Sequence, residues 1–400
     1  MQKIILNWSI ILLVSIPIGF TQTKPSAAQQ QTKILSLELS FGDKNLPSEY
    51  LLARPMGIYV NNTNNIYVLD EYRIKVYDQN GKAKTIFGGK GNGPGEFNLE
   101  PYIISSTPDG FLTIYDRSCL FHNVYTPNNS FVKKTYIRTN SILNDFISTN
   151  NFQLKKILKI LCINENEQII ECILIDLSTV KEGIMFSGLI YLTNKNVSFI
   201  TKKEILSFKL DKWSEFHWEL IADKTIITSY FNCTINPPRT TLTEYSLEFI
   251  DFSGTVNSEI KHPYQPVVLS DSVRKKLTEN IDELPKLSRG FDAGFGVKDA
   301  HKGAIKSLER ILKLNQYTPM QQLKTDGGYI FIFTNRVNNK NEILTDVFDV
   351  KIKKYISSSY FPFIPLVIKN GYAYKFNDAG LTKDYPKVEK YKITPAVYGR

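Results

Sequence analysis

Cationic side chains recur in the short connections between the predicted strands of this chain. Arg73, Arg117 and Arg336 each lie in a connection that begins with Asp or Asn. A guanidinium group presents a planar fork of donors that fits carboxylate or phosphate oxygens. The pattern indicates a site for an anionic ligand, but Asp and Arg in such turns can equally pair with each other or with the backbone.

The candidate ligand-binding residues share one position, in connections expected at a single end of the strands. They are Arg54, Tyr72, Arg73, Lys90, Arg117 and Arg336.

A glycine-rich loop at residues 88–95 could in principle cradle a phosphate group. It lacks the G-x-x-x-x-G-K-[ST] order of a phosphate loop, and no helical pattern follows it. We interpret it as a connection between repeats. The chain also has no G-x-S-x-G, H-E-x-x-H, EF-hand or C-x-x-C motif, and its four histidines are scattered. We therefore assign no catalytic residue and no metal ligand.

The chain has four cysteines, which is compatible with one or two disulfides in an exported protein. Cys162 and Cys172 flank a turn-like segment at residues 164–168, so they could form a disulfide across a hairpin. The alternative is that the cysteines are small buried apolar residues, as free cysteine usually is.

These candidates lie in a repeat with a period of 46 residues. Each repeat contains short runs of alternating apolar residues closed by Asn, Asp or Gly, which is typical of an antiparallel unit. A fixed period of this size indicates a repeat architecture. Three pairs of residues show the 46-residue interval: Pro55 and Pro101, Asp70 and Asp116, and Pro319 and Pro365.

The first repeat resembles the NHL-repeat type of β-propeller. The resemblance rests on Pro55 with Gly57, on residues 66–70, on residues 73–78 with Gly81, and on residues 87–97. More loosely, the chain is similar to TolB-like six-bladed propellers of bacterial envelope and secreted proteins. The resemblance implies a fold and a binding role, but no activity.

Six such units predict an all-β, six-bladed propeller of four-stranded antiparallel blades. Residues 32–41 alternate as one strand ahead of the first complete unit, whereas the last unit offers only three strand-like runs, at 363–368, 372–376 and 388–393. We expect the N-terminal strand to complete the last blade and so close the ring.

Helical spacing interrupts the strands before blade five. Apolar residues recur at helical intervals in 269–284 and 299–314, with Ser270 or Ser272 and then Asp299 as N-caps. We expect this insertion, about 269–316, to cover one face of the propeller. The alternative is that the insertion is peripheral and covers no face.

The composition suits one folded domain over residues 32–400. The chain has 400 residues, 42% hydrophobic and 12% aromatic, which is enough for a large core. A charged start followed by an apolar run at 4–20 predicts a signal peptide at 1–28, with an uncleaved anchor as the alternative. We expect an exported protein, periplasmic, cell-surface or secreted, with no transmembrane segment in the mature chain.

The net charge of +10 is spread along the chain without a long basic run. It indicates solubility and mild attraction for anionic surfaces rather than a nucleic-acid partner.

Two hypotheses about function follow from the sequence. The first is a monomeric binding protein without catalysis or cofactor, which contacts a protein, peptide or glycan through its loop face. The alternative is a lactonase-like hydrolase or lyase with a divalent cation such as Ca²⁺ in the central channel. That alternative needs oxygen and nitrogen ligands converging from several blades.

Overall fold

The structure is a computed structural model that describes most of the chain. The described residues are 33–400 except 44, 108–109, 117–120, 137–139, 165, 179–184, 206–215, 222–223, 232–242, 288–304, 306–307 and 378–384. The predicted signal peptide at 1–28 lies outside them. Among the described residues, none of the helices combines the length and apolar character that a membrane crossing requires.

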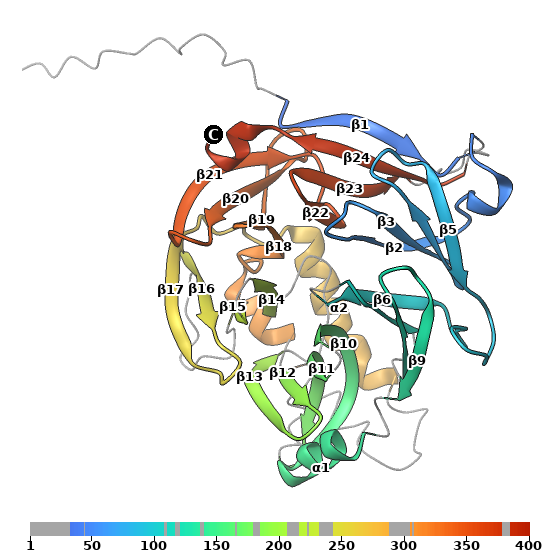
Figure 1. The fold of residues 1–400 in the computed structure, drawn as a ribbon. Coiled ribbons are helices and arrows are strands. Elements are labelled where there is room, and N and C mark those ends of the chain that lie inside the picture. Colours follow the sequence, from blue (N-terminus) through green and yellow to red (C-terminus); the bar gives the residue numbers. More distant parts are fainter. Residues whose placement is uncertain are drawn as a thin grey trace, which may run out of the picture. The chain divides into compact units, whose positions relative to one another are not determined.

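Six four-stranded antiparallel sheets surround a common axis, which confirms the predicted six-bladed propeller (Figure 1). The first strands of blades one to three contact each other around the axis, as do those of blades four to six, and blade six contacts blade one.

The first three blades follow the predicted units. Blade one is β2 (Pro55–Val60), β3 (Ile66–Asp70), β4 (Arg73–Tyr77) and β5 (Ala83–Gly88). Blade two is β6 (Pro101–Ser106), β7 (Leu112–Asp116), β8 (Phe121–Tyr125) and β9 (Phe131–Tyr136). Blade three is β10 (Phe152–Asn164), β11 (Glu167–Asp176), β12 (Met185–Thr193) and β13 (Val197–Ile205).

The last three blades include the closing strand. Blade four is β14 (Phe216–Ile221), β15 (Thr225–Tyr230), β16 (Glu244–Ile250) and β17 (Val256–Pro263). Blade five is β18 (Met320–Asp326), β19 (Tyr329–Val337), β20 (Ile343–Asp349) and β21 (Lys354–Phe361). Blade six is β22 (Val367–Lys369), β23 (Tyr372–Asn377), β24 (Lys387–Ile393) and β1 (Leu35–Phe41). Two short 3-10 helices, η1 (Ser48–Tyr50) and η4 (Pro395–Tyr398), flank this blade.

The middle strands of the first two blades are buried on both faces because a neighbouring blade packs against each face. Every residue of β3, β7 and β8 is buried, whereas the outer strands β5 and β9 are half-exposed. A polar residue in a middle strand is therefore placed between two blades, away from bulk solvent.

In the β4–β5 hairpin turn, the Asp side chain binds the turn backbone and the Gly adopts a positive φ. The Asp78 carboxylate accepts hydrogen bonds from the backbone N–H groups of Asn80 and Lys82, each at 2.9 Å. Gly81 follows with a φ of 76°, which glycine adopts at little cost.

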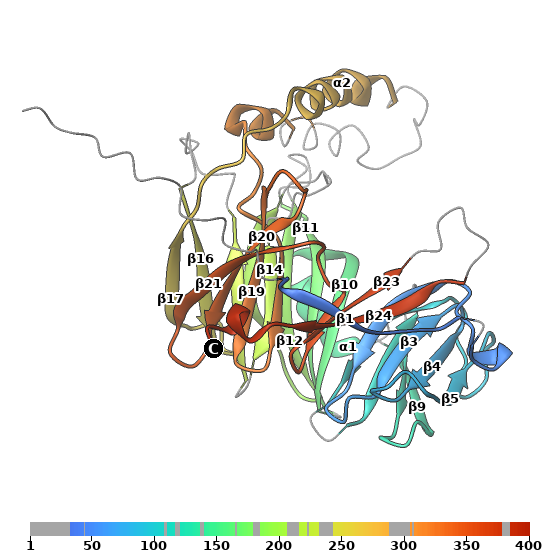
Figure 2. The same ribbon diagram turned by 90° about the horizontal axis from the view of Figure 1, so that it is seen from above.

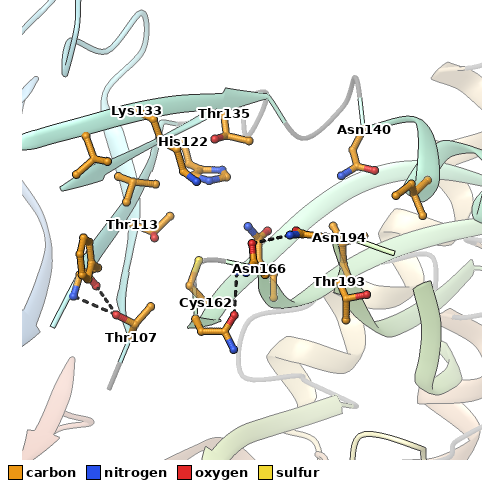
Figure 3. A pocket seen from close by; sticks show the side chains of 17 residues that line it. Thr107, Thr113, His122, Lys133, Thr135, Asn140, Cys162, Asn166, Thr193 and Asn194 are labelled. Atoms are coloured by element: carbon orange, nitrogen blue, oxygen red, sulfur yellow. Dashed lines mark hydrogen bonds between the residues drawn. The ribbon is translucent and has the colours of Figure 1, made fainter. Parts of the chain in front are cut away.

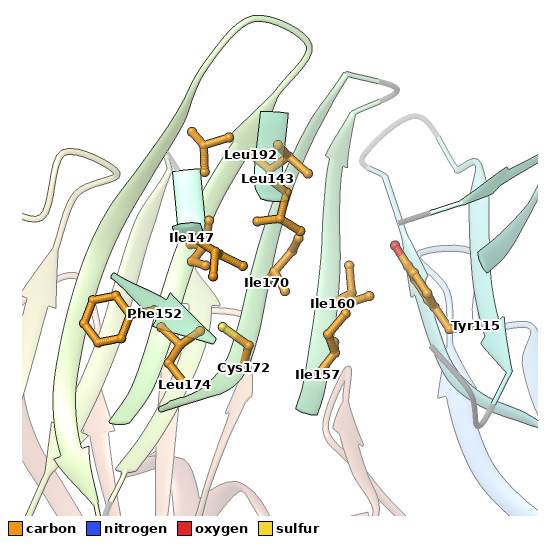
Figure 4. Close-up of a cluster of buried hydrophobic side chains, with 12 residues drawn as sticks. Tyr115, Leu143, Ile147, Phe152, Ile157, Ile160, Ile170, Cys172, Leu174 and Leu192 are labelled. Carbon is orange, nitrogen blue, oxygen red and sulfur yellow. The ribbon is translucent and has the colours of Figure 1, made fainter. Parts of the chain in front are cut away.

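Helix α1 (Ser141–Thr149) was not expected from the sequence. It connects blade two to blade three, and the Asn140 side chain caps it by accepting from the N–H of Leu143 at 3.0 Å. Two residues of this helix, Leu143 and Ile147, are buried in the core between these two blades (Figure 4). The helix thus fills the outer part of that core.

The N-terminal strand closes the ring as predicted. β1 pairs antiparallel with β24, from Leu35 opposite Ile393 to Phe41 opposite Val388. The Phe41 ring then packs against Tyr77 of blade one, with ring centroids 4.7 Å apart. One strand therefore joins the last blade to the first.

The insertion before blade five carries helix α2 (Asp271–Leu287), which lies over one face of the propeller (Figure 2). Ser270 caps it by accepting from the N–H of Val273 at 3.4 Å, as one of the two predicted caps. Leu277 is buried with Leu308 and Ile311, which belong to a helical segment at 308–314. The predicted cap Asp299 lies outside the described residues.

Truncating the closing strand tests how much the ring depends on it. We expect Phe41→Ala to lower the free energy of unfolding by about 3–5 kcal/mol, because Phe41 is buried between blades six and one. Leu37→Ala is the matched control on the same strand, since Leu37 is 50% exposed, and should cost less than about 0.5 kcal/mol. Urea unfolding measures both; equal losses would contradict this role for Phe41.

Candidate functional site

The structure gathers four of the six predicted binding residues at one end of blade one. Arg54 precedes β2, and Lys90 follows β5. Tyr72 lies in the turn from β3 into β4, and Arg73 is the first residue of β4. Arg336 lies at the end of β19 in blade five, and Arg117 lies outside the described residues. We call Arg54, Tyr72, Arg73 and Lys90 the blade-one cluster.

Within the blade-one cluster, two cations remain available for a ligand. The Lys90 Nζ lies 5.3 Å from the centre of the Tyr72 ring, a cation–π distance. Arg73 is exposed and has no ion-pair partner among the described residues. Arg54, in contrast, forms an ion pair with Glu100.

A buried carboxylate fixes the backbone that carries Arg54. Asp70 is 1% exposed, and its oxygens accept from the N–H groups of Ala53 at 3.0 Å and Arg54 at 2.6 Å. The Lys75 ammonium donates to the same carboxylate at 2.7 Å and also to the carbonyl of Leu51. Asp70 is thus a positioning residue rather than a ligand-binding one.

The same clamp recurs in other blades at the same sequence separation. Asp116 accepts from the N–H of Leu99 at 3.4 Å, and Asn335 donates through Nδ2 to the carbonyl of Thr318 at 2.8 Å. Each pair is 17 residues apart, as are Ala53 and Asp70. The recurring Asp or Asn of the sequence pattern therefore pairs with backbone, which was one of the two predicted alternatives.

Arg336 has a different environment from the blade-one cluster. It is half-buried, and its backbone N–H donates to the Thr334 hydroxyl at 3.1 Å. Burial raises the pKa of the nearby Tyr264 phenol, and the Arg336 charge partly opposes that rise.

The innermost strands of blades three to five bring two lysines and one glutamate together. Lys159 Nζ lies 3.1 Å from a Glu219 carboxylate oxygen and 4.3 Å from the centre of the Trp218 ring. Burial lowers the pKa of Lys324, while Glu219 opposes and Lys159 adds to this shift. Among the described residues, no three His, Cys, Asp or Glu side chains form a group suited to a metal ion.

The predicted disulfide between Cys162 and Cys172 is contradicted by the strand register. Across the β10–β11 hairpin, Cys162 lies opposite Gln168, and Cys172 lies opposite Ile157. Both thiols are free and buried. The hairpin reverses between Asn164 and Glu167, closer to Cys162 than to Cys172, so the two cysteines do not face each other. They are the small buried residues of the alternative interpretation.

A pocket of about 420 Å³ lies between blades two and three (Figure 3). Thr113, His122 and Lys133 line it from blade two, and Cys162 and Gln168 line it from blade three. The start of α1 adds residues 140 and 142 to the same lining. Sequence reasoning did not find this pocket, because its two walls come from different repeats.

His122 is a buried polar side chain in the lining of the pocket. It is 3% exposed, and its Nδ1 has no hydrogen-bond partner among the described residues. Its ring lies 4.8 Å from that of Tyr115. Burial lowers the pKa of His122 to about 4, and the positive charge of Lys133 contributes to the shift. The imidazole is therefore neutral at neutral pH.

Comparisons with known proteins add little to this geometry. No protein-family model and no curated protein matches the chain. A protein from Bacteroides fragilis NCTC 9343, named as a predicted exported protein, is 11% identical with a TM-score of 0.45, over 90% of this chain and 96% of that chain. A member of the DUF4221 family from Bacteroides vulgatus ATCC 8482 is 9% identical with a TM-score of 0.46, over 90% of this chain and 98% of that chain. At this level of similarity they support no inference about function, and the NHL-repeat and TolB-like resemblance stays a prediction.

Removing the buried carboxylate of blade one should destabilise the fold strongly. We expect Asp70→Ala to lower the free energy of unfolding by about 3–5 kcal/mol, because it leaves the buried Lys75 charge without its partner. Adding Lys75→Met to this variant should recover part of the loss. Asp78→Ala, which removes only turn hydrogen bonds, is the control and should cost about 1 kcal/mol. A similar loss for Asp70→Ala and Asp78→Ala in urea titrations would contradict the clamp.

The lowered pKa of His122 predicts a pH dependence of stability. Below pH 6.5 the unfolded chain binds a proton that the folded chain resists until about pH 4. His122 should therefore remove up to about 3 kcal/mol of stability as the pH falls between these values. Denaturant titrations at several pH values should show a smaller loss for His122→Phe than for the wild type. Thr113→Val, in the same pocket, should leave the pH dependence unchanged; identical profiles for all three proteins would contradict a buried neutral His122.

Proposed function

We propose that this chain is an exported β-propeller binding protein with NHL-like repeats. It recognises an anionic protein, peptide or glycan through the connections at one end of its blades, and it acts as a monomer without catalysis. The N-terminal sequence supports export, since residues 1–28 have the pattern of a signal peptide.

The observation that carries this proposal is the blade-one cluster. Arg73 and Lys90 are both exposed, and the Tyr72 ring beside Lys90 is half-exposed. Two cations next to an aromatic ring offer charge-assisted hydrogen bonds to an anionic group and a stacking surface for an apolar part of the same ligand. The Asp70 clamp holds the neighbouring backbone, so the ligand meets a preorganised surface.

Helix α2 supports the same choice of face. It belongs to the connection from β17 to β18, which is a connection of the same kind as those that carry Arg54 and Lys90. In a propeller such connections lie on one face, together with the turns from second to third strands. The insertion therefore enlarges the face on which the blade-one cluster lies.

Charge reversal at the blade-one cluster tests the proposal. We expect the mature chain to bind polyglutamate or polygalacturonate, and Arg73→Glu with Lys90→Glu to weaken that binding about tenfold or more, because two attractive charges become repulsive. Biolayer interferometry at low and physiological salt gives the affinities, and binding should weaken as salt rises.

The matched control places the same charge change at the other end of the same blade. Lys82 and Lys84 are exposed residues near the β4–β5 turn, and Lys82→Glu with Lys84→Glu should leave the affinity nearly unchanged. Equal weakening by the two double variants would indicate non-specific attraction by net charge and would overturn the proposed site. If the wild type bound neither polyanion, the proposal of an anionic ligand would be overturned.

A further inference from the structure

We propose that the pocket between blades two and three binds a neutral, hydroxyl-bearing small molecule of about the size of a simple sugar. This site is separate from the blade-one cluster, because its walls are blades two and three and the α1 start. Its volume of about 420 Å³ lies within the usual range of roughly 300–1,000 Å³ for small-molecule sites.

Beside the apolar core of blades two and three, the pocket has polar groups at positions where blades one and two pack apolar side chains. The corresponding core between blades one and two consists of buried apolar and aromatic side chains such as Leu69, Val76 and Leu112. Between blades two and three, His122 and Thr113 take positions in fully buried strands. Leaving a buried polar group unpaired costs about 1–3 kcal/mol. A ligand that forms a hydrogen bond with such a group in the pocket would therefore stabilise the folded protein.

Two unsatisfied atoms in the pocket lining define the ligand chemistry. Neither His122 Nδ1 nor Gln168 Oε1 has a hydrogen-bond partner among the described residues. The amide oxygen of Gln168 only accepts hydrogen bonds, whereas Nδ1 accepts or donates according to the tautomer. Hydroxyl groups both donate and accept, so one polyhydroxylated molecule can satisfy both atoms, one from each blade.

The charges of the lining favour a neutral ligand. Lys133 is the single charged side chain among the described lining residues, and it is exposed. Burial lowers the pKa of His122 and raises that of the Cys162 thiol, so both groups are uncharged at neutral pH. An ion entering the pocket would lose hydration without gaining a buried counter-charge.

The rest of the lining suits a ring that has both C–H and O–H groups. Phe111, Val124 and Leu192 supply apolar surface. Exposed side-chain amides supply polar groups on the blade-three side, where Asn194 Nδ2 donates to Asn166 Oδ1 at 2.5 Å (Figure 3). A molecule with apolar and hydroxyl faces matches this combination.

Binding is tested on the mature chain with a fixed panel of small molecules. The neutral probes are methyl glucoside, methyl galactoside, N-acetylglucosamine and mannitol, and glucuronate is the charged counterpart. We expect at least one neutral probe to raise the melting temperature in a saturable way and to shift the His122 signal in spectra of histidine-labelled protein. Glucuronate should bind more weakly than the best neutral probe.

Two variants remove the unsatisfied atoms while keeping the volume of the side chains. His122→Phe and Gln168→Met should each abolish the stabilisation, with circular dichroism checking that the fold is kept. Cys172→Ala, a buried substitution in blade three at a residue outside the pocket lining, should retain it. The blade-one variant Arg73→Glu with Lys90→Glu should also retain it, which separates this proposal from the preceding one.

Three results would overturn the proposal. The first is that no neutral probe gives saturable binding, which means that the pocket holds only water. The second is that glucuronate alone binds, which assigns the site to anions at Lys133. The third is that His122→Phe and Gln168→Met both keep full binding, which places the bound probe elsewhere.

Discussion

The six blades are separate sheets, and the ring is held closed because blade six combines strands from opposite ends of the described chain: β1 pairs with β24 and completes that sheet. Each blade shares a buried apolar core with the neighbouring blade on both sides. Phe41 of β1 also connects blade six to blade one, because its ring packs on Tyr77 of blade one. The blade that bears four of the six predicted binding residues is the one that adjoins the closing strand.

Within the closed ring, buried polar side chains form hydrogen bonds that fix the backbone next to exposed residues. Asp70 binds the N–H of Arg54, and the Lys75 ammonium neutralises it at 2.7 Å. At the matching positions of blades two and five, Asp116 accepts from the N–H of Leu99, and Asn335 donates to the carbonyl of Thr318. Asp70 is thus part of the structural frame, whereas Arg73 and Lys90 at the same end of blade one are exposed.

Most of the fold could be predicted from the sequence because its determinants are local and periodic. Alternating apolar residues, Asp and Gly turns and the 46-residue interval defined the blades, and the three-stranded last unit required a partner strand. Helix α1 was missed, since it is short and lies between two strand patterns. The error about Cys162 and Cys172 arose from the register of one hairpin, which spacing alone does not fix. The pocket was missed because His122 and Gln168 come to line one cavity only when two blades pack.

The central claim is that recognition takes place at the blade-one end that carries Tyr72, Arg73 and Lys90. Hydrogen exchange of the mature chain, followed by mass spectrometry with and without polyglutamate or polygalacturonate, tests it most directly. The account predicts slower exchange in peptides that cover residues 71–73 and 88–97, with little change in the β4–β5 turn of the same blade. Protection confined to other blades, or equal protection at both ends of blade one, would contradict it.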